Sequence, residues 1–363
     1  MASRRSARLT PASNSHKRQF NDEATETAPS APSTPQKRRT KPTTAPPPPA
    51  TPTPSAIGLM TEGAGANDAS PTKRPRPAAV SRLADPNLTN APLLSPETSR
   101  VVSPKLTAAI PSSLLPNRGG SRTTTTATLL EEACAHLVRV DQRMKRLIDA
   151  HHCRIFSPEG LEEQIDPFES LASGIISQQV SGAAAKAIKA RFVALFNDGD
   201  DANGEGPPKK HRFPHPSQVA ATPVERLRTA GLSQRKAEYV RGLAEKFVSG
   251  ELSAAMLAEA PYEEVLERLT AVRGLGRWSV EMFACFGLKR MDVFSLGDLG
   301  VQRGMAAFVG RDVAKLKAKG GKWKYMSEKE MEEIAERFRP YRSLFMWYMW
   351  RVEDTPTDVS TLE

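Results

Sequence analysis

The sequence contains few of the residues that support disulfide-rich, iron–sulfur or membrane-embedded folds. It has three cysteines in 363 residues, Cys134, Cys153 and Cys285, and no two of them form a Cys-x-x-Cys pair. We therefore expect neither a disulfide framework nor a four-thiolate zinc or iron–sulfur site, and we read the chain as intracellular. No apolar run approaches the roughly 20 residues of a membrane span, and none follows the basic N-terminus, so neither a membrane segment nor a secretory signal is expected.

An excess of positive charge is also missing from most of the chain. The formal net charge is +10, but residues 1–125 hold 17 basic and 7 acidic residues, which leaves 34 of each sign in the remainder. A surplus of basic residues favours nucleic-acid binding only by the segment that carries those residues. Beyond residue 125, nucleic-acid binding must therefore be argued from local motifs.

Residues 1–125 are poor in aromatics and hold 20 of the 30 prolines. Such a segment cannot bury enough apolar surface to offset its chain entropy, so we predict a disordered tail. Two short basic clusters, residues 37–41 and 73–76, are typical of nuclear import signals. We therefore expect a nuclear protein. The alternative is that these clusters only keep the tail solvated.

From about Thr128 the apolar residues recur at helical spacing, and no alternating strand pattern appears. Ser181 and Ser233 are placed to cap helices, and Ser327 with Glu330 forms a capping-box pattern. The sequence predicts an all-α domain over residues 126–355, with a polar insertion at about 197–216 and a short C-terminal tail at 356–363.

The most informative local pattern is a pair of glycines around one apolar residue, Gly274-Leu275-Gly276, between two helical stretches. Glycines permit a tight turn and a close approach of the backbone to a ligand. The helix that begins near Arg277 and includes Ser279 offers free N–H groups to a phosphate, which favours binding to the DNA backbone. An ordinary turn between two core helices is the alternative.

Five segments in order resemble motifs of the helix-hairpin-helix (HhH-GPD) DNA glycosylase superfamily, in particular its alkylpurine branch. They are residues 174–181, 231–236, 265–283, 293–300 and 340–343. The resemblance implies two helical subdomains with the helix-hairpin-helix motif and an active-site cleft between them. It also implies a monomer that acts on duplex DNA containing alkylated bases, with no required cofactor and a monovalent cation at the hairpin.

The resemblance places the catalytic aspartate at Asp298, while Asp292 is expected to have a structural role. A carboxylate next to the sugar would stabilise the cation that develops as the base leaves. The alternative for Asp298 is a helix N-cap, and both roles are compatible. In glycosylases that also cleave the backbone, a lysine stands two residues after the second hairpin glycine; here that residue is Trp278. A monofunctional glycosylase is therefore predicted.

Aromatic side chains stack on cationic purines, so the resemblance implies a base pocket. Its predicted members are Trp278, Tyr341, Phe168 and Met282, where Met282 replaces an aromatic residue of bacterial relatives. Core packing is the alternative for each aromatic residue. Gln179, in the turn between two helices, is the predicted wedge that fills the space left by the extruded base, and backbone capping is its alternative.

Two other functions compete with a monofunctional glycosylase. One is a non-catalytic DNA-binding protein that keeps only the hairpin, which Asp298 and the aromatic positions disfavour. The other is a bifunctional glycosylase-lyase, which Trp278 disfavours. No protein-ligated metal is expected, because the histidines and cysteines do not show ligand spacing.

Overall fold

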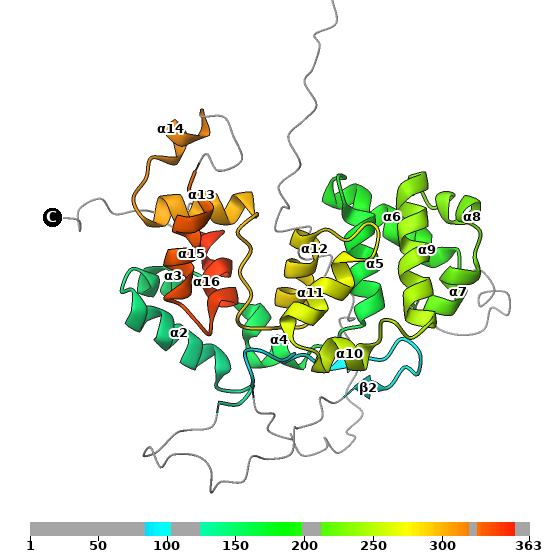
Figure 1. Ribbon diagram of the computed structural model, residues 1–363, viewed down its shortest axis with the longest axis horizontal. Helices are drawn as coiled ribbons and strands as arrows, with labels where there is room; N and C mark the ends of the chain where they lie inside the picture. Colours follow the sequence, from blue (N-terminus) through cyan, green and yellow to red (C-terminus); the bar gives the residue numbers. More distant parts are fainter. Residues whose placement is uncertain (1–83, 103–123, 198–211, 319–324, 353–363) are drawn as a thin grey trace, which may run out of the picture. The chain divides into compact units, whose positions relative to one another are not determined.

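The computed structural model describes residues 84–102, 124–197, 212–318 and 325–352, all within one compact unit of the chain (Figure 1). These residues are predominantly helical, which confirms the predicted all-α class. The elements before the hairpin are β1 (Leu93–Leu94), β2 (Val101–Val102), α2 (Leu129–Val140), α3 (Met144–Ala150), η2 (Arg154–Phe156), α4 (Pro158–Glu162), α5 (Pro167–Ser177), α6 (Gly182–Ala194), α7 (Pro216–Ala221), α8 (Val224–Arg228), α9 (Gln234–Val248), α10 (Ala254–Glu259) and α11 (Tyr262–Thr270). Those after it are α12 (Arg277–Met282), the π turn η3 (Phe283–Gly287), α13 (Leu299–Phe308), α14 (Val313–Lys317), α15 (Glu328–Glu336) and α16 (Arg342–Met349).

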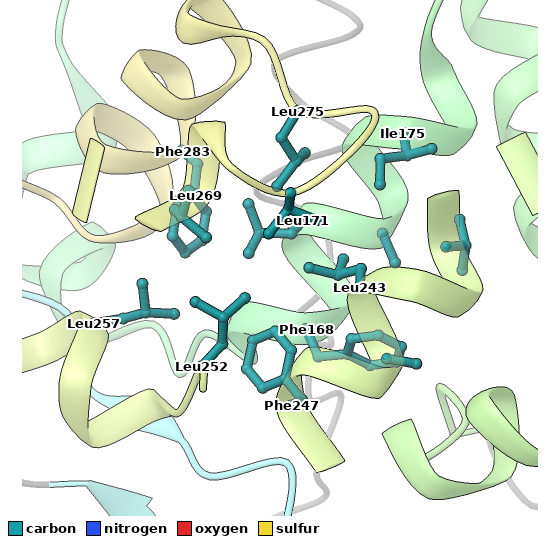
Figure 2. Packing of buried hydrophobic residues seen from close by; sticks show 14 of the residues in the cluster. Phe168, Leu171, Ile175, Leu243, Phe247, Leu252, Leu257, Leu269, Leu275 and Phe283 are labelled. Atoms are coloured by element: carbon teal, nitrogen blue, oxygen red, sulfur yellow. The ribbon is translucent and has the colours of Figure 1, made fainter. Parts of the chain in front are cut away.

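The apolar residues form two separate cores, as expected for two helical subdomains. The first core is built by α5 to α11 and includes Phe168, Leu243, Phe247 and Leu269. Figure 2 shows these side chains converging from α5, α9 and α11. The second core is built by α2 to α4, α13, α15 and α16.

Helix α12 and the π turn after it are shared by both cores. Val280 and Phe283 pack in the first core, whereas Met282 and Phe286 pack in the second. A helix buried on both sides carries apolar residues around its whole circumference, which the run Val280 to Phe286 satisfies apart from Glu281. The hairpin helix is therefore fixed rigidly between the two subdomains.

Residues 84–102 belong to the folded part, which corrects the predicted tail boundary at residue 125. Ala91 and Leu93 are fully buried, and β1 pairs antiparallel with β2. The Asn90 amide donates to the carbonyl of Lys289, and the N–H of Met291 donates to the carbonyl of Pro86. This segment therefore braces the chain directly after the hairpin helix. The basic clusters at 37–41 and 73–76, like the predicted C-terminal tail at 356–363, lie outside the described residues.

The predicted insertion at 197–216 ends in a segment that packs against the first core. Residues 198–211 lie outside the described part of the chain, but Phe213 packs edge-on against Phe168, with ring centroids 5.8 Å apart. The Asn197 amide donates to the carbonyl of Arg212 over 3.1 Å, which brings the two ends of the segment together. The end of the predicted insertion thus contributes to the core.

Helices α13 and α16 lie unusually close because two glycines face α16. A Cβ on Gly304 would overlap the backbone carbonyl of Met349, and one on Gly300 would come within 2.8 Å of the Trp350 ring. Such contacts are possible only where the side chain is a hydrogen atom. The sequence Gly-x-x-x-Gly therefore brings Trp350 beside the first turn of α13. Among the described helices, none combines the length and apolarity needed to cross a membrane.

Candidate active site

The hairpin between α11 and α12 requires glycine at Gly274 but not at Gly276, whose φ of −85° is open to any residue. Gly274 has φ +96°, and a Cβ there would meet the Tyr239 ring at 2.5 Å, so both the backbone and the space require glycine. Leu275 is buried and points toward Leu171 and Ile175 of α5 (Figure 2). Gly276 is exposed and caps α12, with open space where a Cβ would stand. The hairpin is thus anchored at Leu275 and accessible at Gly276.

The turn between α5 and α6 is tied to this hairpin. The Gln178 side-chain amide donates to the carbonyl of Gly274 over 2.8 Å. The Lys236 ammonium donates to the carbonyls of Ile176 and Gln178, at 2.8 and 2.6 Å, and burial lowers the pKa of this lysine. Gln179 is exposed with φ +56°, so its side chain projects from a fixed turn beside the hairpin.

Asp298 lies at the start of α13, where it is both helix cap and buried carboxylate. It is 2% exposed, and its Oδ1 accepts the N–H of Val301 at 2.8 Å. The indole N–H of Trp350 donates to Oδ1 over 2.9 Å, and the indole N–H of Trp278 donates to Oδ2 over 2.8 Å. Each carboxylate oxygen is therefore held by one tryptophan. The cap predicted as the alternative is present, and it leaves the carboxylate in a defined orientation.

The two flanking tryptophans were not equally predictable. Trp278 was expected to stack on a base, and the structure places its N–H on Asp298. Trp350 was not predicted at all, because its only sequence signal is a position at the end of the last helix. Both rings are half-buried.

A second acidic residue, Glu281, lies close to Asp298 and was also missed. Its carboxylate is 3% exposed. It accepts a hydrogen bond from the Ser295 hydroxyl over 2.5 Å and pairs with the Arg277 guanidinium at 2.9 Å. Burial raises the pKa of Glu281, and the charge of Asp298 contributes in the same direction. The Arg277 side chain itself is 70% exposed, and Ser279, two residues further along α12, is half-buried.

The remaining predicted pocket residues differ in their surroundings. Tyr341 is half-buried at the start of α16 and meets the His136 ring edge-on, with centroids 5.3 Å apart. Burial raises the pKa of its hydroxyl. Phe168 and Met282 are completely buried, Phe168 against Phe247 in the first core and Met282 in the second. Their burial favours a packing role over the predicted contact with a base.

Asp292 has the structural surroundings that were expected for it. Its side chain is 7% exposed and forms ion pairs with Arg339 and Arg342, at 2.5 and 2.6 Å. These residues line a pocket of about 530 Å³ together with Tyr262, Phe294 and Arg277. Asp298 is absent from its lining, so the pocket is separate from the carboxylate described above.

Two lysines near the hairpin in sequence are occupied elsewhere. Lys289 is fully buried, pairs with Glu163 at 3.3 Å and has a pKa that burial lowers. Lys236 supports the turn before α6. Within the described ranges, no group of three or more His, Cys, Asp or Glu side chains is arranged to hold a metal ion.

The chain is similar to known proteins of base excision DNA repair. The family described as HhH-GPD superfamily base excision DNA repair protein matches residues 172–320. The chain is 35% identical over 252 residues to the DNA-3-methyladenine glycosylase of Saccharomyces cerevisiae, covering 62% of this chain and 80% of that protein. It is 31% identical over 225 residues to DNA-3-methyladenine glycosylase 1 of Schizosaccharomyces pombe, covering 62% and 88%. The crystal structure of a DNA-3-methyladenine glycosidase from Bacillus halodurans aligns with a TM-score of 0.47 and 31% identity, covering 61% of this chain and 89% of that one.

Proposed function

The chain belongs to the HhH-GPD superfamily of base excision DNA repair proteins, and on this premise we propose that it is a monofunctional glycosylase for alkylated purines in duplex DNA. The observation that carries the proposal is Asp298, a buried carboxylate whose two oxygens are each fixed by an indole N–H. The enzyme hydrolyses the N-glycosidic bond and leaves an abasic site.

The reaction needs a negative charge more than it needs a strong acid. The target nucleotide leaves the helical stack, and an alkylated purine already carries the positive charge that makes it a good leaving group. As the bond breaks, positive charge develops on the sugar, and a preorganised carboxylate next to it stabilises that charge. Asp298 has this role and also orients the attacking water. Trp278 and Trp350 hold the carboxylate in place, so that it need not reorganise during the reaction.

Trp278 also accounts for the absence of lyase chemistry. Cleavage of the backbone would require an amine that forms a Schiff base with the sugar. At the position where lyases of the superfamily carry lysine, this chain has an indole whose N–H donates to Asp298. Attack by water alone is therefore the reaction that these residues support.

DNA binding is assigned to the hairpin and the turn beside it. Gly274, Leu275 and Gly276 present the backbone to a phosphate, with a monovalent cation at the hairpin carbonyls, while Arg277 and Ser279 flank it. Gln179 is the proposed wedge, which its exposed position on a rigid turn supports. Trp278 and Tyr341 are the proposed aromatic walls of the base pocket.

Several further assignments complete the proposal. The protein acts as a monomer in the nucleus and requires no cofactor for hydrolysis. The basic clusters of the N-terminal region, outside the described residues, direct nuclear import. We place the start of the catalytic domain at about residue 84, since residues 84–102 pack against it, and its end at about residue 355.

The test is release of free base from methylated duplex DNA, with strand breaks examined before any alkali treatment. Asp298→Asn keeps the helix cap but removes the charge and places an amide against an indole N–H. We expect it to lower the rate roughly 100- to 1000-fold. Asp292→Asn is the control, because it removes a carboxylate that pairs with Arg339 and Arg342. We expect its main effect to be on stability, with a smaller effect on the rate of base release. Full activity of Asp298→Asn would refute the mechanism.

The same assay separates the competing functions. Binding of damaged DNA without any base release by the wild-type protein would favour a non-catalytic DNA-binding protein. Strand breaks before alkali treatment would favour a bifunctional glycosylase-lyase.

A further inference from the structure

Glu281 is a buried carboxylate for which the proposed chemistry gives no role. It lies in α12 between Val280 and Met282, both fully buried, and it is itself 3% exposed. A buried carboxylate is costly unless it is paired and hydrogen-bonded, and an apolar residue of similar volume is often at least as stable. Packing alone would therefore favour an apolar side chain at this position.

The two partners of Glu281 differ in exposure, since Arg277 is 70% exposed and Ser295 is fully buried. On the outer side, Oε1 accepts the Nε–H of Arg277 over 2.9 Å, from the first residue of the hairpin helix. On the inner side, Oε2 accepts a hydrogen bond from the hydroxyl of Ser295 over 2.5 Å. Ser295 is completely buried. Glu281 thus connects the accessible hairpin to a residue of the interior.

Ser295 is the first residue of the four-residue turn that ends at Asp298. The N–H of Asp298 points to the carbonyl of Ser295, with N and O 3.4 Å apart. The backbone carbonyl of Leu296, the second residue of the turn, accepts a hydrogen bond from the side-chain amide of Gln302 over 3.3 Å. The turn is therefore held at its start by Glu281 and by Met346, whose sulfur accepts the Ser295 N–H at 3.3 Å. It is held in its middle by α13 and at its end by the two tryptophans on Asp298. Loss of the Glu281 bond would leave the carboxylate attached, while the Ser295 side chain and the adjoining backbone could shift.

We propose that Glu281 is a positioning residue, which fixes Asp298 through Ser295 and links that turn to the DNA-binding hairpin through Arg277. This inference rests on the proposed glycosylase function. It predicts that loss of the Glu281–Ser295 hydrogen bond slows base release without an equal loss of DNA binding. A purely structural role would change stability and leave the rate of the folded protein intact.

The test compares Glu281→Gln, Ser295→Ala and the double variant in the full chain. Three quantities are measured: the single-turnover rate of base release at saturating protein, the Kd for duplex containing a tetrahydrofuran abasic analogue, and the melting temperature. Ser295→Ala is the more selective change, because it leaves the Arg277–Glu281 pair in place. Glu169→Gln is the matched control, since it removes a carboxylate that lies in α5, is 15% exposed and is paired with Lys189 of α6.

We expect Glu281→Gln and Ser295→Ala each to lower the single-turnover rate roughly 10- to 100-fold, because a displacement of about 1 Å at a reacting group can cost that much. The double variant should be no slower than the slower single variant, as both changes act on the same Glu281–Ser295 hydrogen bond. The Kd should change far less than the rate, and Glu169→Gln should keep the wild-type rate.

The inference is overturned if Ser295→Ala, folded and bound to DNA, releases base at the wild-type rate. It is also overturned if the Kd rises by the same factor by which the rate falls. The same holds if the rate losses of the two single variants multiply in the double variant. Should Glu281→Gln not fold, Ser295→Ala alone decides the question. Absence of base release by the wild-type protein would instead overturn the proposed function, so the two failures are distinguishable.

Discussion

Replacement of Trp350 by phenylalanine isolates the contribution of one hydrogen bond to the candidate active site. The substitution keeps an aromatic ring and removes the indole N–H that donates to Asp298 Oδ1 over 2.9 Å. The bond has a charged acceptor that is 2% exposed, and such bonds contribute about 1.5–3 kcal/mol. If that energy is available in the transition state, its loss corresponds to roughly a 10- to 150-fold slower reaction.

The assay is single-turnover release of methylated base with protein in excess over DNA, accompanied by a melting curve for each variant. The loss of ring volume must be separated from the loss of the donor, because Trp350 also packs against Phe286, with ring centroids 5.5 Å apart. Trp347→Phe provides the control. It is the same change three residues earlier, within α16, at a buried ring that stands edge-on to Tyr348. We expect it to lower the melting temperature and to leave the rate within about twofold of wild type.

The reasoning is refuted if Trp350→Phe releases base as fast as the wild-type protein. It is also refuted if Trp347→Phe slows the reaction to the same extent, because the effect would then reflect packing of α16. An intermediate result is informative as well: loss of rate with no loss of stability would mean that the bond orients Asp298 and contributes little to folding.

Two predictions concern the fold that supports the site. Removal of residues 1–83 should leave the melting temperature and base release unchanged. Removal of residues 1–123 should lower the free energy of unfolding by roughly 3 kcal/mol and the melting temperature by about 6–12 °C, because it exposes the partners of Leu93 and its neighbours. Equal stability of the two truncated chains would contradict this. Gly304→Ala should destabilise by about 1–3 kcal/mol or more, since the added methyl group would overlap the Met349 carbonyl, while Gly242→Ala, which has open space in the middle of α9, should stabilise by up to about 1 kcal/mol in chemical denaturation.

The parts of the fold that sequence could predict are those that depend on neighbouring residues. Ser181, Ser233 and Ser327 cap their helices as expected, each by accepting the backbone N–H of the residue three positions further on. The requirement for glycine at 274 was likewise visible, because a tight turn between two amphipathic helices needs a positive φ. Such signals are local, and no distant contact is needed to read them.

The parts that were missed depend on contacts between distant positions. Residues 84–102 are proline-containing and poor in aromatics, and their order comes from bonds to residues 288–291, about 200 positions away. Periodicity could show that Phe168 and Met282 have apolar neighbours, but which core each faces depends on helices elsewhere in the chain. The contact between Trp350 and Asp298 spans 52 positions and requires the space that Gly300 leaves.

Trp278 shows how one residue can serve two of the proposed requirements. By resemblance, Trp278 stands where the lyases of the superfamily carry lysine, and it is also a predicted member of the base pocket. In the structure the N–H at the edge of its ring holds Asp298, while stacking on a cationic purine uses the face of the ring. The two interactions therefore do not compete. A lysine at this position would offer a nucleophile but would also introduce a charge next to Asp298 and remove one of its two indole donors. Hydrolysis by water and the orientation of the carboxylate are thus linked through a single side chain.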